Sequence, residues 1–147
     1  MPQPQTLQTL LAFDFGTQRI GVALGNTLLR QARPIEIIRA QTKLQRFARI
    51  EALIVQWQPD ALVVGLPLTP EGGEQLVTRQ CRRFGHQLQG RFGLPIILVD
   101  ERDSSIQAQE TVGNSADDAM AAAIILQRYL DALPSTSNES EHDQSAN

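Results

Sequence analysis

Cysteine is almost absent from this chain of 147 residues, which contains Cys81 alone. A single cysteine cannot build a disulfide framework, and such scarcity is typical of proteins that work under reducing, intracellular conditions. No run of residues approaches the ~18–20 apolar side chains that a membrane span needs. The polar start at Met1–Thr6 lacks the pattern of a secretory signal. We therefore expect a cytoplasmic protein that does not engage a membrane.

An excess of positive charge is also missing. Lysine and arginine total 13 against 16 acids, and Lys43 is the only lysine. Three of the acids stand in the final segment 134–147, so the body carries as many acids as bases. This balance excludes the strongly basic footprint of a protein that coats DNA. A local patch of arginines, whose planar fork suits phosphate groups, stays open, although genome composition explains an arginine bias equally well.

The order of apolar runs predicts one α/β domain over residues 7–133, between disordered segments at 1–6 and 134–147. Runs with strand and helix periodicity follow one another as β-β-β-α-β-α-β-α-α. An antiparallel meander followed by β-α-β units predicts a mixed sheet with helices on both faces. Ligands of such sheets bind beside the carboxyl ends of the strands.

The expected elements have these limits. The strands are Leu7–Phe15, Ile20–Leu24, Ile35–Arg39, Ala61–Val64 (closed by Gly65) and Pro95–Val99. One helix begins after a capping box at Thr42 and Gln45 and buries Leu44, Phe47, Ile50, Ile54 and Trp57. A second helix, Glu74–Gln89, buries Val77, Cys81, Phe84 and Leu88; a short helix starts at Ser104, and an alanine-rich helix spans Ser115–Leu130.

Three carboxylates stand where a ligand site is expected. Asp14 interrupts the most apolar run of the chain, where a buried, unpaired carboxylate would be costly. Glu101 follows a buried strand directly, and Asp118 lies in line with Ala122 and Ile125 on one face of the last helix. Each acid also has a plainer explanation: Asp14 as a turn former, Glu101 in a solvated loop, and Asp118 as a helix-capping residue.

Carboxylates that converge from three elements could hold Mg²⁺ or Mn²⁺, because hard divalent ions prefer oxygen ligands. Two such ions activate water and stabilise the leaving oxygen in phosphodiester hydrolysis. His86 and His142 lack the spacing of zinc ligands, and neither a P-loop nor a nucleophile elbow is present. We expect Cys81 in the core and His86 on the surface.

Four stretches of the chain together carry a family resemblance. The first is Phe13-Asp14-Phe15-Gly16-Thr17-Gln18-Arg19-Ile20-Gly21-Val22-Ala23. The others are Val63-Val64-Gly65-Leu66-Pro67-Leu68, Asp100-Glu101-Arg102, and the run from Asp118 through the alanine-rich helix to Leu130. These stretches resemble the YqgF family of pre-16S rRNA nucleases, which are similar to RuvC-type Holliday junction resolvases and share the RNase H-like fold. The resemblance covers nearly the whole expected domain.

The resemblance implies roles for particular residues. Asp14, Glu101 and Asp118 fall on the family's catalytic, metal-binding acids, which implies Mg²⁺ or Mn²⁺ as the cofactor. Arg19 and Arg102 fall on motif arginines, and with Thr17 and Ser105 they are the expected nucleic-acid-binding residues. The implied activity is a cytoplasmic, metal-dependent nuclease that processes the 5′ end of the 16S rRNA precursor during ribosome biogenesis. The expected partner is structured RNA, with branched DNA as a further substrate, and we expect a monomer.

Other functions stay open at this point. The stretch between Glu101 and Asp118 lacks a basic cluster, which favours a catalytically weak nucleic-acid-binding factor of ribosome assembly. A DNA nuclease of the Holliday junction resolvase type is a second alternative. The run Asp14-Phe15-Gly16-Thr17 also resembles the phosphate loop of actin-like and sugar-kinase-like ATPases, which typically need two lobes and a much longer chain.

Overall fold

A five-stranded mixed sheet forms the centre of the computed structural model, with the strand order β3-β2-β1-β4-β5. The structure describes residues 7–39, 42–101 and 116–134, and for 116–118 it describes the backbone only. The strands are β1 (Thr9–Phe15), β2 (Ile20–Asn26), β3 (Ala32–Ile38), β4 (Ala61–Leu66) and β5 (Ile96–Asp100). The first three pair antiparallel, whereas β4 is parallel to both β1 and β5. The predicted α/β mixed sheet is confirmed.

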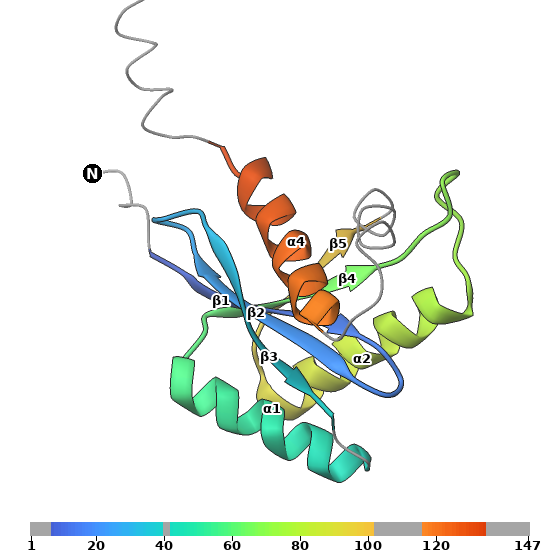
Figure 1. Cartoon of the computed structure of the whole chain (residues 1–147), viewed down its shortest axis with the longest axis horizontal. Helices are drawn as coiled ribbons and strands as arrows, with labels where there is room; N and C mark the ends of the chain where they lie inside the picture. The colour runs from blue at the N-terminus through green and yellow to red at the C-terminus, as the bar shows by residue number, and fades with distance from the viewer. Residues whose placement is uncertain (1–6, 40–41, 102–115, 135–147) are drawn as a thin grey trace, which may run out of the picture.

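Helices cover both faces of this sheet (Figure 1). Helices α1 (Lys43–Trp57) and α2 (Leu76–Phe92) lie on one face, and α4 (Ala116–Ala132) crosses the other. The predicted capping box is present: the Thr42 hydroxyl accepts from the Gln45 backbone N–H at 3.0 Å, and Gln45 Oε1 accepts from the Thr42 N–H at 3.2 Å. Among the described residues, no helix combines the length and apolar character that crossing a membrane requires.

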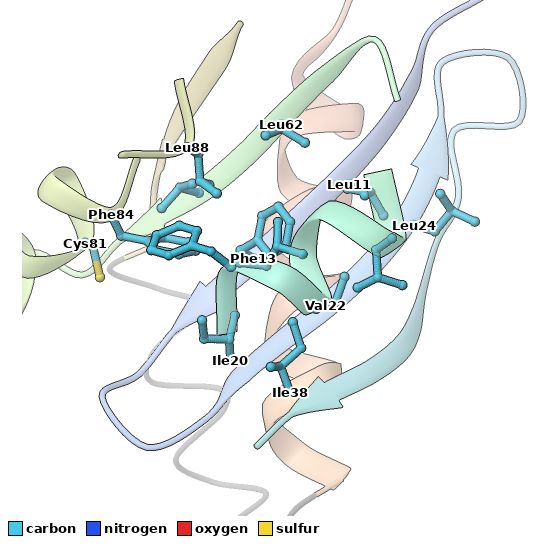
Figure 2. Close-up of a cluster of buried hydrophobic side chains, with 14 of the residues drawn as sticks. Leu11, Phe13, Ile20, Val22, Leu24, Ile38, Leu62, Cys81, Phe84 and Leu88 are labelled. Carbon is cyan, nitrogen blue, oxygen red and sulfur yellow. The ribbon is translucent and has the colours of Figure 1, made fainter. Parts of the chain in front are cut away.

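Two hydrophobic cores result, one on each face. Figure 2 shows the larger core, in which Phe13 and Phe84 lie among aliphatic side chains between the sheet and the helices α1 and α2. Cys81 belongs to this core, as predicted, and His86 is exposed, as predicted. The core under α4 is built mostly from smaller residues: Leu10, Ala12, Ala23, Ala61, Val63, Val99, Ala122, Ala123, Ile125, Leu126 and Leu130.

Several expected boundaries are wrong. Gly65 lies inside β4 instead of closing it, because it still pairs with Val99. Strand β3 starts at Ala32 and contains Pro34, which an edge strand tolerates because one side of it makes no ladder bonds. Leu44 is 75% exposed because the buried stripe of α1 begins only at Phe47.

The remaining expectations about elements have mixed outcomes. Val77 is partly exposed, and Thr78 takes the buried position in the first turns of α2. The Thr78 hydroxyl donates to the Pro67 carbonyl and accepts from the Gln75 N–H, so both of its hydrogen-bonding functions are satisfied inside the protein. The expected helix at Ser104 and the expected disordered segments at 1–6 and 134–147 lie outside the described residues, apart from Pro134, so they stay predictions.

Candidate active site at the carboxyl ends of the strands

Side-chain alternation brings two acids and a glycine to the same face of three adjacent strands. Residues under α4 alternate along each strand: Leu10 and Ala12 in β1, Ala61 and Val63 in β4, Ile97 and Val99 in β5. Because the side-chain period of a strand is two, the next residues on that face are Asp14, Gly65 and Glu101. Parallel pairing of β1, β4 and β5 places all three at the carboxyl edge of the sheet.

Gly65 leaves space that the Glu101 side chain uses. A Cβ atom built on Gly65 would lie 3.0 Å from the carboxyl carbon of Glu101 and 2.5 Å from Cδ1 of Ile125 in α4. The Glu101 backbone N–H donates to the Leu66 carbonyl at 3.1 Å, which continues the ladder between β4 and β5 by one residue. The absence of a side chain at Gly65 therefore allows both the carboxyl group of Glu101 and helix α4 to approach the sheet closely.

Glu101 is buried, with 6% of its surface exposed, and its environment disfavours the charged form. Burial raises the pKa of Glu101 to about 8, with further contributions from the negative charges of Asp14 and Asp100. The positive charge of Arg128 in α4 acts in the opposite direction. Burial, together with the negative charges of Glu101 and Asp14, raises the pKa of the Cys81 thiol to about 12, so this thiol stays protonated and unreactive.

The turn between β1 and β2 forms an open hollow beside the acids. Residues 14–19, from Asp14 to Arg19, line this hollow, which has a volume of about 230 Å³. Thr17 and Arg19 are both exposed there. Arg46 in α1 fixes the turn from the opposite face, because its Nη2 donates to the Thr17 carbonyl at 2.9 Å. The structure thus brings the predicted residues Asp14, Thr17 and Arg19 to one surface.

Hydrogen bonds at its far end set the direction of α4. Gln127 accepts from the Ala32 N–H and donates to the Arg30 carbonyl, each at 2.9 Å, and Arg30 Nη1 donates to the Leu133 carbonyl at 3.1 Å. These residues lie at the turn between β2 and β3, next to the amino end of β1. Helix α4 therefore runs back along the sheet, and its first turn lies toward the carboxyl end of β1 (Figure 1).

Lengths support the same placement. A helix of 17 residues extends ~25 Å, and a strand of seven residues extends ~23 Å. With its last turn near the amino end of β1, α4 is long enough for its first turn, which contains Asp118, to reach toward the carboxyl edge of the sheet. The Asp118 side chain is outside the described part of the structure.

The predicted site is thus partly assembled within the described residues. Asp14 and Glu101 are neighbours, but the described side chains include no third His, Cys, Asp or Glu that would complete a metal-holding group with them. Arg102 and Ser105 lie outside the described residues. Sequence reasoning missed Arg128, although it follows Ile125 at helical spacing and so shares the face of α4 that packs on Gly65.

The sheet order, the helices on both faces and the acids at the strand ends define an α/β protein with an RNase H-like fold. Two solved structures of this class match most of the chain. RuvC of T. thermophilus in complex with a Holliday junction substrate has a TM-score of 0.53 at 16% identity, covering 85% of this chain and 94% of that chain. The Fowlpox virus resolvase in complex with Holliday junction DNA has a TM-score of 0.54 at 11% identity, covering 86% and 99%.

The chain belongs to the RuvX family, whose profile is described as "Holliday junction resolvase" and matches residues 8–132. It is thereby a member of a family of phosphodiester-hydrolysing nucleases. A relative from Bordetella petrii named "Putative pre-16S rRNA nuclease" is 62% identical over 128 residues, covering 86% of this chain and 98% of the relative. A relative of the same name from Burkholderia mallei is 53% identical over 131 residues, covering 86% and 90%. The resemblance inferred from the four motifs is confirmed.

Proposed function

We propose that this nuclease depends on a divalent metal ion, Mg²⁺ or Mn²⁺, and processes the 5′ end of the 16S rRNA precursor in the cytoplasm. The observation that carries the proposal is the pair of carboxyl groups, Asp14 and Glu101, on either side of Gly65. Each raises the energy of the other's charged form, and a divalent cation between them would remove that repulsion. Without such a cation, a buried acid at this edge would only destabilise the fold.

The donor set fits a hard divalent ion. Asp14 and Glu101 offer oxygen ligands in a space that a Cβ on Gly65 would fill, and Asp118 is proposed as the third ligand from α4. Bound there, the ion would supply an activated water and stabilise the leaving oxygen of a phosphodiester. Glu101, with its raised pKa, has to release a proton before it can act as a ligand, and the charge of Arg128 favours that release.

The β1–β2 turn is suited to hold the phosphate next to the scissile bond. Arg19 and Thr17 line the hollow that begins at Asp14, and they supply a cation and a hydroxyl group for phosphate oxygens. Arg102 and Ser105, which follow Glu101 in the chain, are proposed as further contacts on the basis of the family resemblance. Residues 1–133 carry equal numbers of acids and bases, so the overall charge does not attract nucleic acid. Binding therefore has to come from local arginines such as Arg19 and Arg102.

The names of the relatives favour structured RNA as the substrate. The family description and the two resolvase structures with Holliday junctions support branched DNA as the alternative substrate. A catalytically weak assembly factor on the same fold is the third candidate, supported by the lack of a basic cluster between Glu101 and Asp118. We propose that the protein acts as a monomer.

The test compares three substrates with the purified full-length chain: a 16S precursor fragment that carries its 5′ extension, the mature fragment, and a four-way DNA junction. Each is incubated with Mg²⁺, Mn²⁺ or EDTA, and ATP hydrolysis is measured in parallel. We expect metal-dependent cleavage of the precursor, and Mn²⁺ should also raise the melting temperature. Asp14→Asn and Glu101→Gln should abolish cleavage while the protein stays folded.

Asp60→Asn is the matched control. Asp60 lies at the opposite end of the sheet, where its Oδ2 accepts from the Thr9 N–H at 2.7 Å, and an asparagine oxygen can keep that bond. This variant should cleave like the wild type. Binding without cleavage in any metal would instead support the assembly factor, and cleavage of the junction alone would support the DNA nuclease. Cleavage that persists in EDTA would rule out the metal-dependent mechanism.

A further inference from the structure

A second feature lies on the other side of the β1–β2 turn, where two arginines cover a cluster of phenylalanines. The ring of Phe84 stacks on Phe15 with centroids 4.7 Å apart and on Phe47 with centroids 6.1 Å apart. The guanidinium carbon of Arg46 lies 5.7 Å from the centroid of Phe15, and that of Arg91 lies 4.1 Å from the centroid of Phe47. We call Arg46, Arg91 and these three rings the arginine–phenylalanine surface.

The two arginines of this surface differ from others on the same helices. In α1, Arg49 forms an ion pair with Glu36 at 2.6 Å, and in α2, Arg82 is paired with Glu74. Within the described residues, neither Arg46 nor Arg91 forms an ion pair. Aromatic rings hold their guanidinium groups in place instead, which leaves N–H donors available for a ligand.

One end of the arginine–phenylalanine surface, formed by Phe15 and Arg46, is close to the acids. Phe15 follows Asp14 directly in β1, so the two side chains point to opposite faces of the sheet at the same edge. Thr17 connects the two sides, because it lines the hollow beside Asp14 while its carbonyl accepts from Arg46 at 2.9 Å. Three residues of chain span at most ~11 Å, so Arg46 lies within a few nucleotides' length of the acid pair.

We propose that Arg46 and Arg91 bind the backbone phosphates of a single-stranded segment of the substrate that passes from the acids over the β1–β2 turn. This inference rests on the proposed nuclease function and adds the path by which the substrate leaves the site. Guanidinium groups fixed on aromatic rings bind phosphates without reading bases, so the contact is independent of sequence. It also offers a source of local positive charge for a chain with a neutral body, since Arg46 at the β1–β2 turn and Arg91 on the neighbouring helix form no ion pair within the described residues.

Affinity for RNA in EDTA tests this proposal without requiring cleavage. The double variant Arg46→Gln/Arg91→Gln is compared with Arg49→Gln/Arg82→Gln, which removes the same charge from the same two helices. A labelled 12-nucleotide single strand reports binding by fluorescence anisotropy at several salt concentrations. Melting curves verify that both double variants are folded.

We expect the Arg46/Arg91 variant to bind the strand at least tenfold more weakly, because charge-assisted hydrogen bonds to two phosphates are lost. The slope of log affinity against log salt should fall by about 1.4, which corresponds to two phosphates of a single strand. The Arg49/Arg82 variant should change by less than twofold. Arg91→Gln alone, which leaves the Thr17 contact intact, should give about half of the change in slope.

Equal losses in the two double variants would overturn the proposal, since charge alone would then explain the binding. Polyglutamate is tested as a second ligand. If the Arg46/Arg91 variant lost affinity for polyglutamate but not for RNA, the surface would be a contact for an acidic protein, and the proposal would also be overturned. A wild type that binds but never cleaves, with the expected difference between variants, would reject the proposed nuclease mechanism and keep this surface. A wild type that cleaves, with no difference between variants, would do the reverse.

Discussion

The two faces of the sheet are packed in different ways. The face under α1 and α2 is filled by large side chains, among which Phe13, Phe47 and Phe84 are almost completely buried. The face under α4 contains more small residues, with alanines in its core and glycines beneath the helix: a Cβ on Gly25 would lie 3.0 Å from Leu126, and one on Gly65 would lie 2.5 Å from Ile125. Helix α4 consequently lies much closer to the strands than large side chains would allow.

This difference separates stability from function. Burial of large apolar side chains supplies most of the free energy of folding, and that surface is concentrated on the face of α1 and α2. The α4 face gives up side-chain volume, and in return Ile125 of α4 and the Glu101 carboxyl group pack closely over Gly65. Changes on the α4 face should therefore affect activity more than stability, and changes on the other face should do the opposite.

The largest expected effect comes from the first turn of α4, where Asp117 and Asp118 are adjacent. Neighbouring helix positions diverge by ~100°, and Asp118 shares its stripe with Ala122 and Ile125, which face the sheet. Asp118→Asn keeps the size of the side chain and removes the charge that a hard cation needs. We expect it to lower metal-dependent cleavage more than about a hundredfold with little change in melting temperature.

Asp117→Asn is the control for this prediction and should cleave within a few-fold of the wild type. Cleavage rates and melting curves of the two variants decide the matter. An inactive Asp117→Asn beside an active Asp118→Asn would mean that the assigned helical register is wrong. Full activity of both variants would reduce Asp118 to a capping residue.

Gly65→Ala tests the close approach itself. The added methyl group would meet Ile125 and the Glu101 carboxyl carbon at 2.5 and 3.0 Å, so α4 or Glu101 has to move. Such overpacking costs roughly 1–3 kcal/mol of unfolding free energy, and the displaced acid should lower cleavage in addition. Chemical denaturation and cleavage rates measure the two effects separately.

Ile125→Val in the same chain should partly restore both, because it removes the Cδ1 atom that would lie nearest to the new methyl group. A Gly65→Ala protein with wild-type stability and activity would show that α4 tolerates a larger distance. In that case the contrast between the two faces would have no consequence for the site.

Much of this architecture could be predicted because it depends on local pattern. The order of strands and helices follows from apolar periodicity, and the Thr42 cap follows from a four-residue motif. Asp14 could be singled out because an acid inside an apolar run is unusual wherever it occurs. The carboxyl edge could be named in advance because parallel strands place their ends together.

The rest depends on contacts between distant parts of the chain. Gly65 looked like a strand terminator, and only the packing of Ile125 and Glu101 over it shows why a side chain is missing inside β4. The raised pKa of Glu101 arises from tertiary burial, which no sequence spacing encodes. Arg46 reaches Thr17 across 29 positions of sequence, so its contact with the β1–β2 turn left no local signal.

A smaller effect is expected in the dependence of stability on pH. Burial, Asp14 and Asp100 raise the pKa of Glu101 from 4.5 to about 8, so between these values the folded protein keeps a proton that the unfolded chain has released. Unfolding free energy in EDTA should therefore fall as pH rises from about 4.5 to about 8 and level off above. Glu101→Gln should lose this component and be the more stable protein at pH 9.

Urea denaturation of both proteins at pH 5, 6.5 and 9 measures the difference, in which the other titrating groups cancel. Mn²⁺ should oppose the fall in the wild type, because binding to the ionised carboxylates stabilises the folded state. Parallel profiles for the wild type and Glu101→Gln would contradict the assignment of the raised pKa to Glu101.

The smallest expected effect is Gly85→Ala, the counterpart of Gly65→Ala on the opposite face. Gly85 lies inside α2, and an added Cβ would meet Ile96 at 3.4 Å and Leu98 at 3.5 Å, which are ordinary contact distances. Glycine in a helix interior is less favourable than alanine by roughly 0.5–1 kcal/mol, so this substitution should raise the unfolding free energy by up to that amount. Cleavage should stay at the wild-type rate because α2 contributes none of the acids. The same denaturation experiment would then show that an added methyl group lowers the unfolding free energy at Gly65, under α4, and raises it at Gly85, in α2. Equal destabilisation by the two substitutions would mean that the faces are packed equally tightly and that their difference in residue size is incidental.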